Sequence, residues 1–157
     1  MQQTRILLFP PARGTAPAQS PDEVKKVLGA DVVAVPEKAF DDMVAAARDA
    51  GIEWLPGVAT ASEVMAAQRH GLERLKFFPA VPAGGIALLD ALAGPFPGMR
   101  FCPTGGIDAD NAASWLARPN VFAVGGSWPA PRKLIAARDW KRITALCRQA
   151  AALRSRA

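Results

Sequence analysis

The segment Leu72–Ala80, "LERLKFFPA", places a lysine in the middle of a run that otherwise has the pattern of a buried strand. Apolar residues stand on both sides of Lys76, whereas the other lysines of the chain occur in polar helical or loop contexts. Burying an ammonium group costs free energy unless the group is paired or loses its proton. The position of Lys76 therefore needs a specific explanation.

Two explanations for this lysine are open on physical grounds. A lysine in a desolvated interior has a lowered pKa, so its neutral amine is available to attack a ketone and form a Schiff base. Alternatively, the ammonium pairs with a buried carboxylate, or the side chain extends from an edge strand toward solvent. The residues around Lys76 favour neither explanation over the other.

Outside this segment, short apolar runs alternate with longer amphipathic ones. Thr60 with Glu63 forms a capping-box pattern, which predicts a helix start. The alternation predicts an α/β fold with parallel strands and right-handed crossovers. Helices are predicted at 20–28, 40–50, 60–70, 84–93, 108–118 and 139–154, and strands at 31–36, 52–57, 74–79, 99–106 and 121–126.

Two glycine pairs follow predicted strands, in "PTGGI" (103–107) and "VGGSW" (124–128). Glycine lets the backbone approach a ligand closely, and N–H groups at a helix start bind anions. Asp108 is the predicted N-cap of the helix after the first pair. We expect a phosphate site at these loops, with Ser127 as an additional hydroxyl donor; a purely structural turn is the alternative for each pair.

Composition favours a single domain without a membrane span. The chain has 157 residues, and none of its apolar runs approaches the roughly 18 residues that a membrane helix requires. The opening apolar run is too short for a signal sequence, so we expect a cytoplasmic protein. Cys102 and Cys147 form no CxxC motif and no cluster with histidine, which predicts two reduced core thiols and no metal.

The net charge of +5 is concentrated at the carboxyl end. From residue 130 onward, eight basic residues accompany one acid, Asp139, whereas apolar residues recur at helical spacing from Trp140 to Leu153. This pattern predicts an amphipathic helix with a solvated basic face. No aromatic residues are interleaved with the charges, so we expect no nucleic-acid site.

Three segments closely resemble the 2-keto-3-deoxy-6-phosphogluconate (KDPG) aldolases and the related 4-hydroxy-2-oxoglutarate aldolases. They are "GVATASEVMAAQRHGLERLKFFPA" (57–80), "RFCPTGGI" (100–107) and "GGSW" (125–128), and the similarity runs in order from about Gly29 to Leu153. The resemblance implies a class I, Schiff-base enzyme on a (β/α) barrel of the TIM type. It also implies a trimer, as in the family.

The resemblance also implies roles for single residues. Lys76 matches the position that forms the imine with pyruvate, and Thr104 matches the one beside the pyruvate carboxylate. Gly105, Gly106 and Ser127 match the positions that hold the substrate phosphate. Phe78 and Pro79 complete the floor of the same pocket.

The amino-terminal part departs from the family pattern. A segment of the type "LEVTLRT", whose glutamate is the family's general base, and a "GAGTV" strand have no counterpart here, and Val35-Pro36-Glu37 stands where the family commonly has "SPG". Glu37 is a candidate substitute base, with a surface loop glutamate as the plainer account. We therefore expect a TIM-type barrel incomplete at the amino terminus, with about five to six strands, over 21–157, after an irregular segment at 1–20.

Three accounts of the shortened barrel are open: a truncated or frame-shifted product, a chain that oligomerises to cover the gap, or a remnant with another role. The expected activity is aldol cleavage of KDPG to pyruvate and glyceraldehyde 3-phosphate, which is a step of the Entner–Doudoroff pathway and needs no cofactor. The protein is expected to be a homo-oligomer. The expected small-molecule partners are a phosphorylated keto acid and pyruvate. The alternative is a noncatalytic phosphosugar-binding or interaction protein derived from the same barrel.

Overall fold

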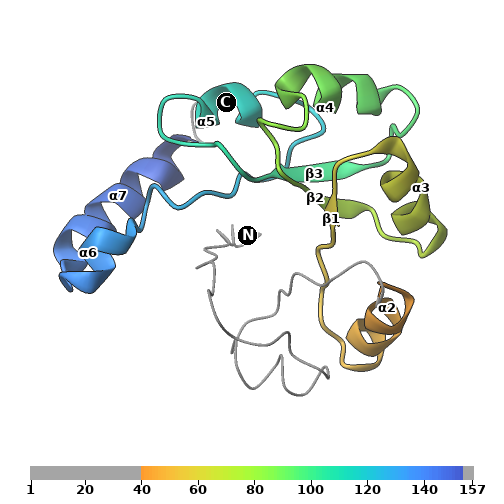
Figure 1. Ribbon diagram of the computed structural model, residues 1–157, viewed down its shortest axis with the longest axis horizontal. Coiled ribbons are helices and arrows are strands. Elements are labelled where there is room, and N and C mark those ends of the chain that lie inside the picture. Colours follow the sequence, from red (N-terminus) through yellow and green to blue (C-terminus); the bar gives the residue numbers. More distant parts are fainter. Residues whose placement is uncertain (1–39, 154–157) are drawn as a thin grey trace.

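The computed structural model describes residues 40–153 (Figure 1). The predicted helix at 20–28, the predicted strand at 31–36 and Glu37 lie outside the described residues. The helices are α2 (Phe40–Asp49), α3 (Ala61–Arg69), α4 (Gly85–Ala93), α5 (Ala112–Leu116), α6 (Arg132–Ala136) and α7 (Trp140–Ala152), and the strands are β1 (Gly57–Val58), β2 (Arg74–Phe77) and β3 (Arg100–Pro103).

The three strands form a parallel sheet in the order β1-β2-β3, with α3 and α4 as the crossovers. Lys76 of β2 pairs with Gly57 of β1 and with Cys102 of β3. The Lys76 N–H donates a hydrogen bond of 2.7 Å to the Pro56 carbonyl, which joins the start of β1 to β2. The predicted parallel α/β arrangement is thus confirmed for this part of the chain.

The hydrophobic core lies between one face of the sheet and the helices α3, α4 and α5 (Figure 1). Leu75, Phe77 and Phe101 are fully buried there. The Phe77 ring packs edge-on against Phe101, with ring centroids 6.4 Å apart, and contacts Trp115 of α5 at the same distance. Because side chains alternate along a strand, Lys76 and Cys102 lie on the opposite face.

The predicted strand at 121–126 forms two isolated parallel bridges, Phe101 to Val121 and Thr104 to Gly125, instead of a continuous strand. Three residue steps along 101–104 face four steps along 121–125, so one extra residue interrupts the ladder, as in a β-bulge. The segment still follows β3, which places the second glycine pair beside the first.

Two other predicted elements are shorter in the structure. The Asp108 side chain accepts hydrogen bonds from the N–H groups of Asp110 and Asn111, at 3.0 and 3.1 Å, which holds a turn ahead of α5. Asp108 is therefore not the N-cap, because α5 begins at Ala112. The predicted strand at 52–57 pairs only from Gly57, after Pro56, whose nitrogen has no hydrogen to donate.

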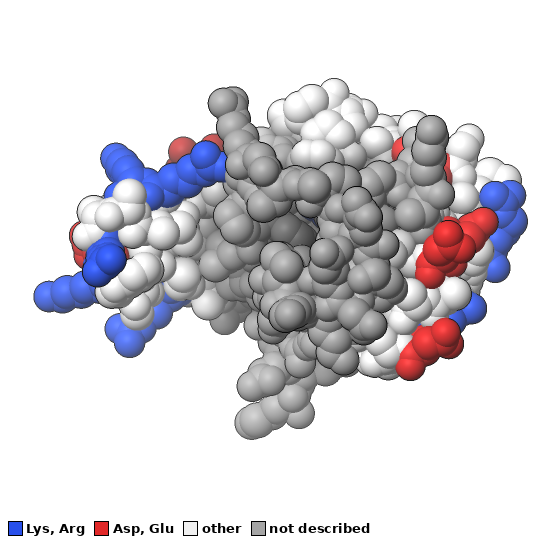
Figure 2. All heavy atoms as spheres, turned by 60° about the horizontal axis from the view of Figure 1, so that its bottom comes forward, with Lys and Arg blue, Asp and Glu red and all other residues white. Residues whose placement is uncertain are grey.

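The short helix α6 was not predicted, and with α7 it extends away from the sheet (Figure 1). Asp139 caps α7 by accepting the Arg142 N–H at 3.0 Å. Lys and Arg side chains surround this end of the molecule (Figure 2), and the apolar residues of α7 are at most half-buried. Trp140, expected on the apolar face, is 58% exposed. Within residues 40–153, no helix is long and apolar enough to cross a membrane.

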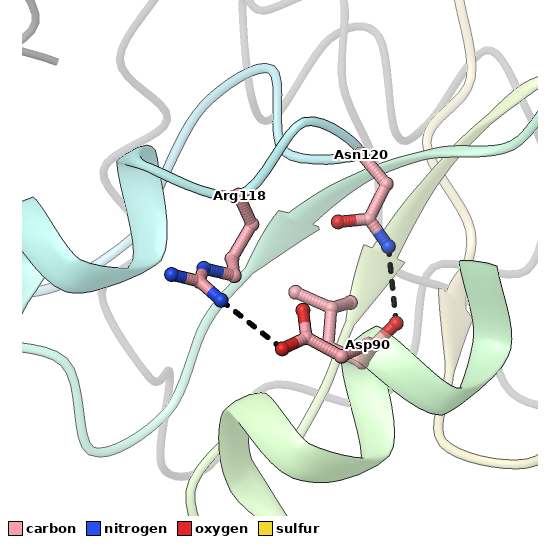
Figure 3. Close-up of polar contacts among 4 residues, drawn as sticks. Asp90, Arg118 and Asn120 are labelled. Atoms are coloured by element: carbon pink, nitrogen blue, oxygen red, sulfur yellow. Dashed lines mark hydrogen bonds and ion pairs between the residues drawn. The ribbon is translucent and has the colours of Figure 1, made fainter.

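Polar contacts connect α4 to the segment that follows α5 (Figure 3). The Arg118 guanidinium lies 3.2 Å from the Asp90 carboxylate. The side-chain amide of the buried Asn120 donates a hydrogen bond of 3.0 Å to the Leu89 carbonyl, and the backbone carbonyl of Asn120 accepts the Phe101 N–H at 2.7 Å. Asn120 therefore fixes both α4 and β3 to the chain that leads into the second glycine pair.

The capping box at α3 generates a stability prediction. Thr60 Oγ1 accepts the Glu63 N–H at 3.3 Å, and the Glu63 carboxylate accepts the Thr60 N–H at 2.8 Å. We expect Thr60→Ala to lower the free energy of unfolding by about 1 kcal/mol, because a helix-end N–H loses its acceptor. Thr60→Ser keeps the hydroxyl and is the control in urea unfolding; equal stability of the two variants would contradict the prediction.

Glu63 also predicts a dependence of stability on pH. Burial raises the pKa of its carboxyl, but hydrogen bonds from Ala59 and Thr60 outweigh burial and bring the pKa below the ordinary value of 4.5. A carboxyl with a lowered folded-state pKa stabilises the fold above the unfolded pKa, and this contribution is lost as the pH falls through the folded pKa. We expect the wild type to lose more stability than Glu63→Gln between pH 6 and about pH 3. If the wild type and Glu63→Gln lose the same free energy of unfolding between the two pH values, the effect is excluded.

Candidate active site

Lys76 lies at the centre of the candidate site, on the sheet face away from the helix-packed core. Its side chain is half-buried, and its Nζ lies 4.6 Å from the centroid of the Phe78 ring. Desolvation lowers the pKa of Lys76 below the usual value, whereas the charge that Cys102 carries when ionised acts in the opposite direction. Burial raises the pKa of Cys102 to about 11, so this thiol is uncharged at neutral pH and contributes no charge beside Lys76 there.

The loops after β2 and β3 are joined by backbone hydrogen bonds. Ala80 N–H donates to the Thr104 carbonyl at 2.8 Å, and Val81 N–H donates to the Gly105 carbonyl at 3.0 Å. The Phe78–Pro79 peptide bond is cis. Carboxyl ends of neighbouring parallel strands lie at the same edge of a sheet, which is why residues of these loops meet beside Lys76.

The first glycine pair is packed tightly against the loop after β2. Gly105 and Gly106 have φ angles of +101° and +79°, in the region that favours glycine. An added Cβ at Gly105 would lie 3.2 Å from the Phe78 ring, and one at Gly106 would lie 2.8 Å from Val81 Cβ. Both glycines are therefore required by the packing of the two loops, whatever else they bind.

The second glycine pair packs against the first loop. A side chain at Gly125 would collide with the Thr104 hydroxyl, and one at Gly126 would collide with the Trp128 ring and the Ile107 carbonyl. Among residues 40–153, the N–H groups of Gly106, Gly126 and Ser127 donate no hydrogen bond to the protein. Unpaired backbone N–H groups at adjacent glycine loops are the donors that an anion would use.

The structure brings most of the predicted site residues into one neighbourhood. Lys76, Phe78, Pro79, Thr104 and Gly105 are linked by the contacts described above. Gly106 lies at its edge against Val81, and Ser127 is exposed on the second glycine loop. The described residues contain no group of three or more His, Cys, Asp or Glu side chains placed to hold a metal ion.

Sequence reasoning treated Cys102 as an ordinary core thiol, although it lies beside Lys76. The signal that could have found it is the strand register, because parallel pairing of "RLKF" with "RFCP" places the lysine opposite the cysteine. Val81, which contacts Gly106, also went unnoticed, since "PAVPAGG" carries no strand or helix periodicity.

Comparison with known proteins gives a match over most of the chain. The sequence profile described as KDPG and KHG aldolase matches residues 12–146. The chain belongs to this aldolase family. Residues 40–146 of the matched range include every element of the candidate site.

Individual relatives agree with this assignment. The 2-dehydro-3-deoxy-phosphogluconate aldolase of Pseudomonas aeruginosa is 48% identical over 122 residues, which cover 78% of this chain and 55% of the relative. The enzyme of the same name from Dickeya dadantii is 40% identical over 140 residues, 88% of this chain and 66% of the relative. The chain thus spans between half and two thirds of the length of these aldolases.

A solved structure is also similar. The KDPG aldolase from Legionella pneumophila, with pyruvate captured at low pH as a covalent carbinolamine intermediate, has a TM-score of 0.75 and 39% sequence identity. The match covers 85% of this chain and 65% of that one. It supports the α/β architecture of the aldolase family for the part of the fold that the two chains share.

The packing of Gly106 gives a further prediction. We expect Gly106→Ala to destabilise the fold by about 1 to 2 kcal/mol or more, because alanine disfavours a positive φ and its Cβ collides with Val81. Gly98→Ala is the matched control, since nothing lies within 4 Å of an added Cβ there and the change should stay within about 0.5 kcal/mol. Denaturant unfolding compares the two, and equal effects would refute the packing argument.

Proposed function

We propose that this chain is a class I aldolase that cleaves KDPG reversibly to pyruvate and glyceraldehyde 3-phosphate through an imine on Lys76. The observation that carries the proposal is a half-buried lysine with a lowered pKa beside two glycine loops. The relatives named as aldolases, and the carbinolamine in the Legionella protein, support the same chemistry. Because the chain covers only part of those relatives, activity, substrate and partners are proposed for it.

The chemistry requires a neutral amine. The nitrogen lone pair of Lys76 forms a bond to the ketone carbon, and the carbonyl oxygen then leaves as water to give the imine. In cleavage, a base takes the proton of the hydroxyl next to the breaking carbon–carbon bond and the aldehyde leaves, while the electrons of that bond flow to the protonated imine nitrogen. The enamine that remains takes up a proton at carbon, and water then releases pyruvate and restores the lysine amine. A lowered lysine pKa increases the amine fraction that starts this sequence at neutral pH.

The glycine loops are the proposed site of the substrate phosphate. Gly105, Gly106 and Ser127 would bind it through backbone N–H groups and the serine hydroxyl, which need no cationic side chain. Thr104 would lie beside the pyruvate carboxylate, with Phe78 and Pro79 forming the adjacent apolar wall. Support comes from the unpaired N–H groups of Gly106 and Ser127 and from the contact between the two loops.

The parallel sheet is, in this proposal, part of a (β/α) barrel of the TIM type. Support comes from the helices packed on one face, the parallel order of β1 to β3 and the bridges that continue the pairing beyond β3. A homotrimer is proposed from the family resemblance. Light scattering measures the molar mass of the protein in solution and tests the proposed trimer directly.

Trapping with pyruvate tests the proposed function. The protein is incubated with pyruvate and borohydride, which delivers hydride to the imine and leaves a stable secondary amine, and peptide mapping locates the adduct. We expect an adduct on Lys76 in the wild type and in the surface control Lys133→Arg. We expect none in Lys76→Arg, because a guanidinium is always charged and has no available lone pair.

A second candidate function is noncatalytic binding of a phosphorylated sugar acid. The observation that favours it is the set of unpaired backbone N–H groups at the two glycine loops, because these groups can bind an anion without any reaction at Lys76. It predicts saturable binding of KDPG in calorimetry with no adduct on the folded wild type. An adduct on Lys76 with release of pyruvate from KDPG would eliminate it.

A further inference from the structure

Two hydrogen bonds hold consecutive carbonyl groups of the loop after β3. The Gly105 carbonyl accepts the Val81 N–H at 3.0 Å. The next carbonyl, that of Gly106, accepts the side-chain amide of Asn111, also at 3.0 Å. Both peptide groups are trans, and the N–H and the C=O of a trans peptide point in opposite directions. The two bonds therefore set the directions of the Gly106 N–H and the Ile107 N–H, which belong to these same peptide groups.

The Asn111 side chain is itself fixed in this position. Its Oδ1 accepts the Asp108 N–H at 3.2 Å, and the backbone N–H of Asn111 donates to the Asp108 carboxylate at 3.1 Å. A backbone carbonyl can only accept and a backbone N–H can only donate, so the two contacts of the amide allow one orientation of its oxygen and nitrogen. The amide therefore points its nitrogen at the Gly106 carbonyl before any ligand binds.

The Ile107 N–H donates no hydrogen bond to the protein in the part of the chain that the structure describes. Ile107 is only 6% exposed, and a donor left without a partner in a buried residue costs free energy. A Cβ added at Gly126 would lie 2.8 Å from the Ile107 carbonyl, so residue 107 lies against the second glycine loop. Its N–H thus belongs to the same pair of loops as the unpaired N–H groups of Gly106, Gly126 and Ser127.

We propose that Asn111 is a positioning residue for the phosphate site, because its amide holds the Gly106 carbonyl and so presents the Ile107 N–H to the anion as a further donor. This inference rests on the proposed function, which assigns the substrate phosphate to the two glycine loops. Asn111 acts on the peptide group and makes no contact with the phosphate. Without its amide, the Gly106–Ile107 peptide is free to rotate, and the donor is no longer held in place.

Titration with inorganic phosphate at constant ionic strength tests the role of Asn111. The protein is labelled with isotopic nitrogen in glycine and isoleucine, and NMR shifts of the amide groups give the dissociation constant of phosphate. We expect Asn111→Ala to weaken phosphate binding about 3- to 10-fold, as for the loss of one hydrogen bond. Ser114→Ala removes an exposed, neutral side chain of α5 and should bind phosphate as the wild type does. Equal dissociation constants for folded Asn111→Ala and the wild type would overturn the proposal.

The wild type provides a measurement that does not depend on the folding of a variant. If the Ile107 N–H binds the anion, its resonance shifts on titration with the same dissociation constant as that of Gly106. In Asn111→Ala the Ile107 shift should decrease more than the Gly106 shift, because Val81 still holds the Gly105 carbonyl. A purely structural role of Asn111 would lower stability without this difference between the two amides. An Ile107 resonance that does not move in the saturated wild type, or a wild type without saturable binding, would overturn the proposal.

Trapping with pyruvate separates this proposal from the function on which it rests. Phosphate titration reports the anion site whether or not Lys76 forms an imine. If the wild type forms no pyruvate adduct while Asn111→Ala weakens phosphate binding as expected, the imine chemistry fails and the role of Asn111 stands. If the wild type forms the adduct and Asn111→Ala binds phosphate equally well, the aldolase chemistry stands and the role of Asn111 fails.

Discussion

The register of β2 between β1 and β3 is the constraint on which the candidate site depends. Side chains on a strand alternate between faces, so a slip of one residue would turn Lys76 toward the helices and Phe77 away from them. The present register gives Phe77 the core contacts with Phe101 and Trp115. The free energy of burying these rings therefore also holds the lysine on the opposite face of the sheet.

The same register links packing to chemistry at the loops. Once β2 and β3 are aligned, the backbone bonds from Ala80 to Thr104 and from Val81 to Gly105 fix the two loops against each other. Close approach of the loops leaves no room for side chains at Gly105 and Gly106. A requirement for glycine in packing does not compete with anion binding, because a backbone without side chains also exposes its N–H groups.

Much of this arrangement could be predicted from the sequence, because its signals are local. Thr60 with Glu63 predicted the start of α3, and the alternation of apolar runs predicted the parallel strands β2 and β3. These local sequence signals gave wrong element boundaries where contacts between distant residues or side-chain hydrogen bonds determine the backbone. An extra residue interrupts pairing at 121–125, and the Asp108 side chain holds a turn where helix spacing continues. The pairing of Lys76 with Cys102 could not be predicted from local patterns, because such patterns do not determine which residue of a neighbouring strand lies opposite.

The choice between the two explanations of a buried lysine can now be argued from its surroundings. A structural ion pair would favour a carboxylate at the paired positions of the adjacent strands, and these positions hold Gly57 and Cys102 instead. Glycine and a protonated thiol contribute no charge, and desolvation lowers the pKa of Lys76. Stabilising an ammonium would call for the opposite residue types. At the two positions paired with it, Lys76 therefore has neighbours that carry no charge at neutral pH, and burial favours its uncharged form.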